Sequence, residues 1–234
     1  MNGDILKLPE AGATVFTIDS ASSSGVVIER INRFVVSVNL KGGEVLCHLH
    51  DPGRLKELIF AGNEVLIRRS NGVKTSHSIT AAKRNGMWIL TDSRFHNRIA
   101  STFLPSGCIP EFRVGKKRID FACGRYLIEV KGSTLCEDGV ALFPDAPSVR
   151  ASEHMRTLRD HVESGNKSMS LILVFSPDAL SFSPNTGTDP EFARELYLAK
   201  KSGVEIRVLK FEFDGNSIHY SGEIPSMIHE PEGC

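Results

Sequence analysis

The sequence predicts an α/β protein, α+β overall, in which a small β-barrel is followed by a domain built on a mixed α/β sheet. Three observations support this fold class. Short β-like stretches separated by Gly and Asn turn signals fill residues 23–90. After about residue 91, helical and strand-like stretches alternate, as in a sheet covered by helices. The length of 234 residues is enough for two hydrophobic cores.

The first half carries the β-rich pattern. The strands expected there are 26–31, 34–40, 44–49, 64–69, 77–82 and 87–91. Between them, only residues 53–60 have a helical pattern. Strands of this length and spacing predict an OB-like barrel over residues 23–90. Residues 1–22 end in a small polar run and are expected to form an irregular N-terminal arm.

The second half, residues 91–234, has the predicted order αβββαβαβ. The expected elements are a helix at 92–103, strands at 111–114, 118–123 and 126–131, a helix at 148–164, a strand at 168–176, a helix from 189 to 203 and a strand at 204–213. The apolar run 168–176 is typical of a strand buried on both faces. Asp189 suits the N-cap of the last helix, Pro190 its first position, and Gly203 its end.

Composition excludes several classes of protein. Apolar residues make up 41% of the chain and charged residues 24%, and no apolar run approaches the roughly 20 residues that span a bilayer. No secretory signal is recognisable, so we expect a cytoplasmic protein without a membrane partner. The five cysteines are scattered and odd in number, which predicts reduced thiols and no structural zinc site. There is no dinucleotide-binding or P-loop motif, and no organic cofactor is expected.

Charge is distributed unevenly although the formal net charge is zero. Residues 23–90 contain ten Lys/Arg against five Asp/Glu, whereas residues 91–234 contain 17 against 20. This asymmetry suits a phosphate-binding module joined to a carboxylate-bearing one. An ordinary solvated surface gives the same numbers and is the simpler explanation of charge alone.

The stretch Arg118–Lys131 carries the chemistry. If Gly124-Arg125 forms a two-residue hairpin turn, Cys123 faces Tyr126 and, further along, Asp120 faces Glu129. Strand alternation then places Ile119, Phe121, Ile128 and Val130 on one apolar face. The opposite face carries Arg118, Asp120, Glu129 and Lys131.

Two opposed carboxylates and a lysine suit metal-assisted hydrolysis of a phosphodiester. Carboxylates placed opposite each other repel, and a shared Mg²⁺ or Mn²⁺ ion removes the repulsion. Lys131 points to the same side, where it can stabilise charge that develops on phosphate. A surface ladder of neutralised charges is the structural alternative, because an Asp…Glu-x-Lys pattern is frequent by chance.

Several basic residues are candidates for binding nucleic acid. Arg68, Arg69, Lys74, Lys83 and Arg84 surround the later strands of the barrel, where Phe34 or Trp88 could stack on bases. Valines flank Phe34, so a place in the core is expected for it. Arg54 follows a His-Asp-Pro-Gly turn whose backbone N–H groups could meet phosphate, although a capped turn with a surface arginine fits equally.

Two further pairs of polar residues are candidates, one in the C-terminal half and one in the barrel. Arg150 and His154 lie one helical turn apart and could clamp a phosphate, with a solvated helix face as the alternative. His48 and His50 form an H-x-H pair, but no further zinc ligands at suitable spacing accompany it.

The chain resembles the sugar fermentation stimulation protein A family. The matching segments are "ERINRFVVSVNL", "CHLHDPGRLKELIFAGNEVLI", "RIDF", "YLIEVKGSTLCEDGVALFPDAPSVRASEHMRTL" and "TDPEFARELYLAKKSGVEI". The resemblance covers most of the chain after residue 25, and its "EVK…FPDA" block is long and specific.

This resemblance implies an N-terminal OB-fold, a C-terminal domain of restriction-endonuclease-like type similar to PD-(D/E)xK nucleases, and a DNA-binding role linked to sugar metabolism. It places Asp120, Glu129 and Lys131 at metal and catalytic positions, and Asn97, Arg150 and His154 at other recurrent polar positions. Val149 and Ala151 depart from the usual Glu and Gly of the family. The loop before Arg118 is short, which leaves Glu111 as a candidate third metal ligand.

The sequence therefore predicts a DNA-binding, regulatory protein with a divalent-metal, nuclease-like site. RNA is an alternative partner, and an active magnesium-dependent nuclease is the alternative function. The oligomeric state is left open, with a homodimer as one expectation.

Overall fold

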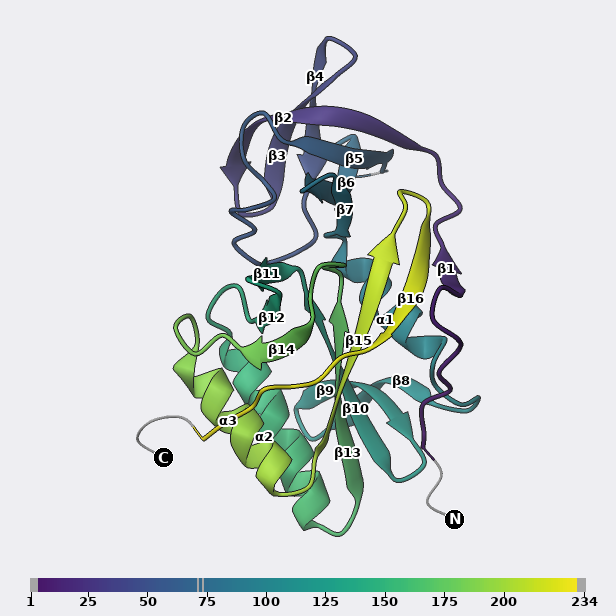
Figure 1. The fold of residues 1–234 in the computed structure, drawn as a ribbon, viewed down its shortest axis with the longest axis vertical. Helices are drawn as coiled ribbons and strands as arrows, with labels where there is room; N and C mark the ends of the chain where they lie inside the picture. Colours follow the sequence, from purple (N-terminus) through teal and green to yellow (C-terminus); the bar gives the residue numbers. More distant parts are fainter. Residues whose placement is uncertain (1–3, 71, 73, 231–234) are drawn as a thin grey trace.

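The computed structural model describes residues 4–70, 72 and 74–230, in which strands outnumber helices (Figure 1). The strands of the barrel region are β2 (Ser22–Asn32), β3 (Val35–Leu40), β4 (Gly43–His48), β5 (Glu64–Arg69), β6 (His77–Arg84) and β7 (Met87–Leu90). The remaining strands are β1 (Thr14–Thr17), β8 (Ile109–Val114), β9 (Lys117–Cys123), β10 (Tyr126–Ser133), β11 (Leu135–Glu137), β12 (Val140–Phe143), β13 (Lys167–Val174), β14 (Ser181–Pro184), β15 (Glu205–Phe213) and β16 (Ser217–Glu223). The helices are the 3₁₀ helix η1 (Ser93–Phe95), α1 (His96–Ser101), α2 (Val149–Glu163) and α3 (Pro190–Lys201).

Strands β2 to β6 form a five-stranded, OB-like barrel, which confirms that prediction. Strand β2 pairs with β3 and β5, and β4 closes the barrel through a short parallel pairing with β6. Inward positions such as Val36 and Val38 are fully buried. Gly25 allows the close approach of β2 and β3, because a Cβ there would lie 2.5 Å from the Val38 side chain.

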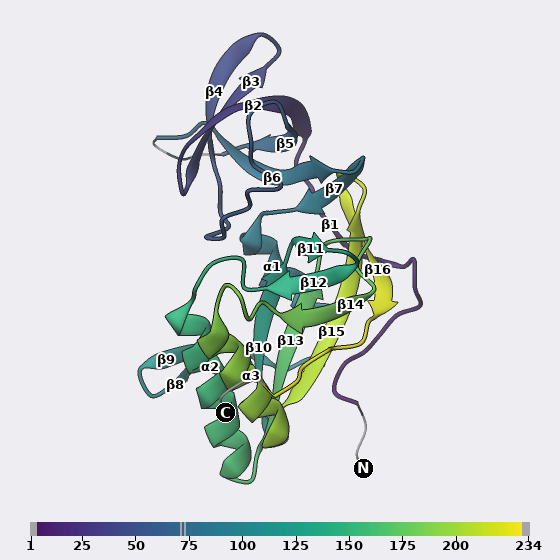
Figure 2. The same ribbon diagram turned by 60° about the vertical axis from the view of Figure 1, so that its left-hand side comes forward.

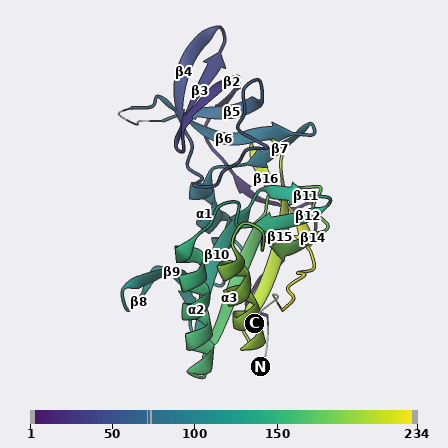
Figure 3. The ribbon, with the colours of Figure 1, turned by 90° about the vertical axis from the view of Figure 1, so that its left-hand side faces the viewer.

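The C-terminal half is built on the parallel strands β10, β13 and β15. Strands β9 and β8 extend this sheet antiparallel on one side, and β16 pairs antiparallel with β15 on the other. Helices α2 and α3 lie side by side over one face, whereas α1 lies on the opposite face (Figures 2 and 3). Two buried clusters, one on each side of the sheet, hold these layers together.

A hairpin joins the two halves. Strand β7 leaves the barrel from β6 and pairs with β15, where Trp88 lies opposite Phe213. Arg84 adds an ion pair to Asp178 at 2.7 Å and a hydrogen bond to the Thr134 carbonyl. The sheet is therefore continuous from the barrel into the C-terminal half.

The helix expected at residues 53–60 is absent. That segment forms turns, with Leu58 and Ile59 donating to the Leu55 carbonyl. An isolated helical turn gains too few hydrogen bonds to persist, and Leu55 has a left-handed φ of 47°. The segment is instead a loop whose backbone faces the C-terminal half.

Residues 4–22 pack against the C-terminal half, in contrast to the irregular arm expected over residues 1–22, of which residues 1–3 lie outside the described part. Strand β1 pairs with β16, and Lys7 donates its backbone N–H to Phe103 at 2.8 Å. Leu6 and Ile18 are buried, so their packing holds this segment against the rest of the protein. The composition of the polar run gave no sign of this long-range strand pairing.

The prediction that every cysteine is reduced is wrong for one pair. Cys108 and Cys123 form a disulfide, while Cys47 and Cys136 are free thiols. Ile109 pairs with Ala122 across β8 and β9, which brings the two cysteines opposite each other. Such pairing depends on strand register and does not follow from cysteine spacing.

Candidate metal and nucleic-acid site

The hairpin of β9 and β10 has the predicted register at its turn. Cys123 pairs with Tyr126, and the ladder continues to the pair of Phe121 with Ile128. Beyond that pair the Asp120 carboxylate enters the ladder, with Oδ2 accepting the Val130 backbone N–H at 2.7 Å. The direct opposition of Asp120 and Glu129 that was expected is therefore replaced by a side chain inserted between the strands.

This insertion also changes the faces of β9. Phe121, Ile128 and Val130 share one buried cluster, as predicted. Ile119 lies in the other cluster, beneath α2 and α3, which corrects its predicted place beside Phe121. Asp120 interrupts the alternation on which the prediction depended.

Glu129 is the most constrained carboxylate of the site. It is 2% exposed, its Oε1 accepts a hydrogen bond from Lys131 Nζ at 2.5 Å, and the same oxygen contacts His154 Nδ1. Burial opposes ionisation, but Lys131 and His154 outweigh it and hold the pKa of Glu129 below its ordinary value. Oε2 is buried without a hydrogen-bond partner.

The pKa of Asp120 shifts in the opposite direction from that of Glu129. Its Oδ1 accepts a hydrogen bond from Asn97 Nδ2 at 2.8 Å. Burial raises the pKa of Asp120, and the nearby charge of Glu129 raises it further. A positive charge shared between the two carboxylates would relieve both effects.

Asn97 is positioned by the packing of His96 against Gly132. The His96 ring is stacked on Phe175 with centroids 5.0 Å apart, and burial lowers the pKa of His96 to about 4. A Cβ on Gly132 would lie only 2.1 Å from His96 Cε1. The glycine directly after Lys131 thus lets η1 and α1 approach β10, and this packing was not predicted from the sequence.

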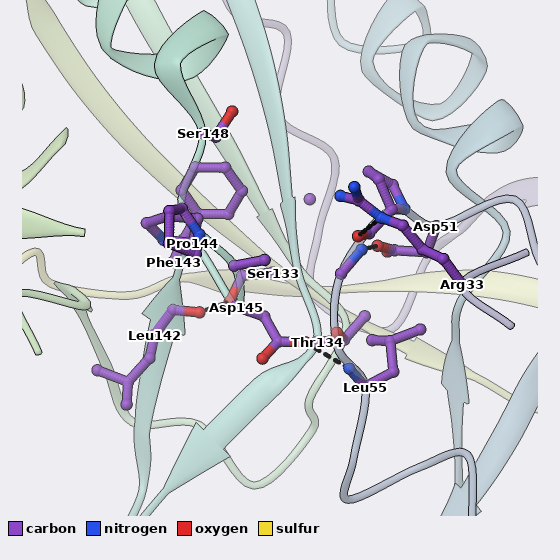
Figure 4. A pocket seen from close by; sticks show the side chains of 15 residues that line it. Arg33, Asp51, Leu55, Ser133, Thr134, Leu142, Phe143, Pro144, Asp145 and Ser148 are labelled. Carbon is purple, nitrogen blue, oxygen red and sulfur yellow. Dashed lines mark hydrogen bonds between the residues drawn. The ribbon is translucent and has the colours of Figure 1, made fainter. Parts of the chain in front are cut away.

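The carboxylates open into a cavity of about 410 Å³ between the barrel and the C-terminal half. Its lining residues are Asp51, Pro52, Ser93, Arg94, His96, Asn97, Asp120, Glu129, Val130, Lys131, Gly132, Phe143 and Arg150. A second cavity of about 190 Å³ shares Asp51, Pro52, Gly132 and Phe143 with it and lies between the loops 51–55 and 143–148 (Figure 4). A third, of about 530 Å³, continues past Arg33 and Gly53 to Arg30, Arg54 and Lys56. Together the three form an interdomain cleft with the Asp120 and Glu129 carboxylates at one end and a basic end lined by Arg30, Arg33, Arg54 and Lys56.

The predicted basic residues of the barrel are largely engaged within the protein. Arg68 is 5% exposed and donates to Ser20 and to the Gly215 carbonyl. Lys83 pairs with Glu64 at 2.8 Å. Arg84 pairs with Asp178, as described above. Arg69 and Lys74 are exposed but do not line the cleft.

The other predicted positions are divided between the cleft and the surface outside it. Arg150 lines the carboxylate cavity and lies 3.5 Å from His154, while Arg54 lies at the basic end. Glu111 is exposed, 3.9 Å from Arg118, and does not line that cavity. Phe34, expected in the core, is 42% exposed on the turn between β2 and β3.

The sequence reasoning missed Arg30, Arg33, Lys56 and Asp145. Arg33 and Asp145 come from loops that are distant in sequence and meet only in the fold, where both line the second cavity. The motifs "HDPGR" (residues 50–54) and "FPDA" (residues 143–146) were recognised, but neither indicates that these two segments lie together in the fold.

The donor atoms suit a hard divalent cation. The unpartnered Oε2 of Glu129 and the Asp120 carboxylate are oxygen ligands of the kind that Mg²⁺, Mn²⁺ and Ca²⁺ prefer. Within the part of the chain that the structure describes, no group of three or more His, Cys, Asp or Glu side chains is arranged for a metal. A cation here would therefore need backbone carbonyls, water or substrate oxygens as further ligands.

Across the described ranges, no helix is long and apolar enough to cross a membrane.

Comparisons with known proteins cover both halves. Residues 28–91 match the model of the SfsA N-terminal OB domain, and residues 94–217 match that of the Sugar fermentation stimulation protein RE domain. A sugar fermentation stimulation protein homolog of Thermoplasma volcanium is 50% identical over 198 residues, which cover 85% of this chain and 91% of that protein. The homolog of Saccharolobus solfataricus is 48% identical over 214 residues, covering 92% and 89%.

A solved structure shares the architecture of most of the chain. The structure of Pyrococcus furiosus SfsA in complex with Ca²⁺ superposes with a TM-score of 0.85 at 27% identity, covering 92% of this chain and all of that one. Family models, close relatives and fold agree along most of the chain, and this protein belongs to the sugar fermentation stimulation protein A family.

Proposed function

We propose that this protein binds DNA in the interdomain cleft and hydrolyses phosphodiester bonds at a divalent-cation site formed by Asp120 and Glu129. The observation that carries the proposal is the buried, unpartnered Oε2 of Glu129 beside the partly buried carboxylate of Asp120. Leaving such an oxygen without a partner is costly unless a ligand satisfies it. We further propose residues 23–90 as the nucleic-acid-binding domain and residues 91–234 as a nuclease-like domain.

The residues around the carboxylates have separate roles in this proposal. A bound Mg²⁺ or Mn²⁺ would polarise the scissile phosphate and lower the pKa of a bound water. Asn97 holds the orientation of the Asp120 carboxylate through its 2.8 Å hydrogen bond. Lys131 lies at the same cavity and can stabilise negative charge on the phosphoryl oxygens.

Arg150 completes the proposed phosphate site, and His154 positions Glu129 from outside the cavity. His154 is buried and contacts Glu129, so it fixes that side chain in place. Arg150 is exposed at the cavity and can donate two hydrogen bonds to a phosphate. The Ca²⁺ complex of the Pyrococcus furiosus relative supports a divalent cation here.

Binding without cleavage is the second candidate function. Lys131 and His154 both engage the same oxygen of Glu129, which competes with use of that carboxylate as a metal ligand. Glu111, a candidate third ligand, lies outside the cavity. A regulator that binds DNA without cleaving it needs the basic end of the cleft but no metal site.

A cleavage assay distinguishes the two functions. End-labelled single- and double-stranded DNA and RNA are incubated with the protein in Mg²⁺, Mn²⁺ or EDTA. The nuclease proposal predicts metal-dependent cutting that is lost in Glu129→Gln and kept in the exposed control Glu137→Gln. Binding by all three proteins with no cutting by any of them would establish the second candidate instead.

A further inference from the structure

Three aromatic rings form a surface on the barrel beside the basic end of the cleft. The rings of Phe34 and His48 are nearly parallel, with planes 15° apart and centroids 6.2 Å apart. His48 contacts His50 edge-on at 4.3 Å. Burial lowers the pKa of His50 to about 4, so that ring is neutral at physiological pH. The result is an aromatic platform, defined as Phe34, His48 and His50, in which Phe34 is 42% exposed.

From this platform we infer that the cleft takes single-stranded nucleic acid, with a base stacked on Phe34 and His48 and its phosphates on Arg33, Arg54 and Lys56. The inference rests on the proposed function and specifies its substrate class. In a duplex the faces of the bases are covered by neighbouring base pairs, so the bases cannot stack on exposed aromatic rings. A single strand can turn its bases onto aromatic side chains.

The platform is continuous with the cleft. Arg33 lies over the Phe34 ring at 5.6 Å and donates to the Pro52 carbonyl at 2.7 Å. Arg33 also lines both the basic cavity and the one next to the carboxylates. A nucleic-acid strand stacked on Phe34 would therefore lie beside Arg33, Arg54 and Lys56, at the basic end of the cleft that leads toward Asp120 and Glu129.

The barrel does not need the Phe34 ring to keep its shape. The backbone of Phe34 is held by its carbonyl, which accepts from Leu49 at 2.9 Å, and by its N–H, which donates to Asn32 Oδ1 at 2.9 Å. An exposed phenyl held by backbone bonds can be replaced with little cost to folding. Trp88, considered as an alternative stacking residue, is only partly exposed, because it lies where β7 pairs with β15.

The experiment measures fluorescence anisotropy of labelled oligo-dT and of a labelled mixed-sequence duplex of equal length, in EDTA so that cleavage does not intervene. The proteins are the wild type, Phe34→Leu, Phe34→Trp and Phe112→Leu, the last removing a comparably exposed phenyl on β8. Phe34→Leu keeps apolar bulk but has no π face, and Phe34→Trp keeps one.

The expected result is tighter binding of oligo-dT than of the duplex, and about a tenfold loss in Phe34→Leu that is specific to oligo-dT. Phe34→Trp and Phe112→Leu should bind oligo-dT like the wild type. Equal affinity of the wild type and Phe34→Leu for oligo-dT, or a preference for duplex, would overturn the inference while the proposed function stands. Absence of binding to either probe would overturn both.

Discussion

The carboxylate of Asp145 accepts a hydrogen bond at 2.5 Å from the backbone N–H of Leu55, across the boundary between the C-terminal half and the barrel (Figure 4). Leu55 has a φ of 47°, in the left-handed region that residues with a Cβ rarely adopt. The bond therefore holds a strained loop in place. That loop carries Arg54, so Asp145 fixes the basic end of the cleft relative to the carboxylate end.

Asp145→Ala should loosen this connection. The substitution leaves the Leu55 N–H without its acceptor, which costs about 1–3 kcal/mol if the group stays buried. We expect a lower free energy of unfolding and weaker nucleic-acid binding, measured by chemical denaturation and anisotropy. Asp145→Asn keeps an acceptor oxygen and is the control. Equal stability of Asp145→Ala and the wild type would show that the bond contributes nothing.

Gly132→Ala should disturb the site without touching a charged group. The new Cβ would meet the His96 ring at 2.1 Å, so η1 and α1 must shift and carry Asn97 with them. We expect loss of stability of about 1–3 kcal/mol from this overpacking and a strong loss of any cleavage activity. The control is Gly187→Ala, where the nearest atom to a Cβ is 3.9 Å away. The prediction is wrong if both variants behave alike.

Asp51 should make stability depend on pH. Burial raises the pKa of Asp51 to about 6 from an ordinary value of 3.8, although Gly53 donates its N–H to the carboxylate. The folded state therefore binds the proton more tightly than the unfolded state, and this contribution to stability is lost as pH rises from about 4 to about 6.

Asp51→Asn keeps the acceptor for Gly53 and removes the charge. We expect it to be more stable than the wild type by about 1–3 kcal/mol at pH 8 and no more stable at pH 3.5. Denaturation curves across this pH range measure the difference between the two proteins. A difference that does not change with pH would contradict the raised pKa of Asp51.

The Cys108–Cys123 disulfide should stabilise the β8–β9 hairpin, whose second strand carries Asp120. It closes a loop with a sequence separation of 15, for which chain entropy gives about 3 kcal/mol. A reducing agent should therefore lower the denaturation midpoint of the wild type. The double variant Cys108→Ser/Cys123→Ser should start from the lower midpoint and show no response to the reductant.

Local sequence patterns were sufficient to predict the β9–β10 hairpin and the grouping of three of its polar side chains. The Gly124-Arg125 turn fixed the register of β9 and β10 as far as Phe121 and Ile128, and Asp120, Glu129 and Lys131 line one cavity as their spacing indicates. The amphipathic pattern and the Asp189 cap likewise predicted α2 and α3. These features depend on neighbours within a few residues.

Features that depend on contacts between distant segments could not be predicted. The Asp120 carboxylate replaces a backbone acceptor inside a strand pair, and strand alternation gives no sign of this. The approach of His96 to Gly132 and of Asp145 to Leu55 depends on how separate elements pack. Arg68 was predicted to bind nucleic acid because it lies in a basic segment, but in the fold it is buried by contacts with Ser20 and Gly215.

Isothermal titration of Mn²⁺ into the purified protein tests whether Asp120 and Glu129 hold a divalent cation. Wild type, Asp120→Asn, Glu129→Gln and the control Glu137→Gln would be titrated in a chelator-free buffer. We expect saturable binding to the wild type and Glu137→Gln, and loss of that binding in both site variants. Binding of Mn²⁺ that is equal in all four proteins, or absent from the wild type, would show that these carboxylates hold no cation.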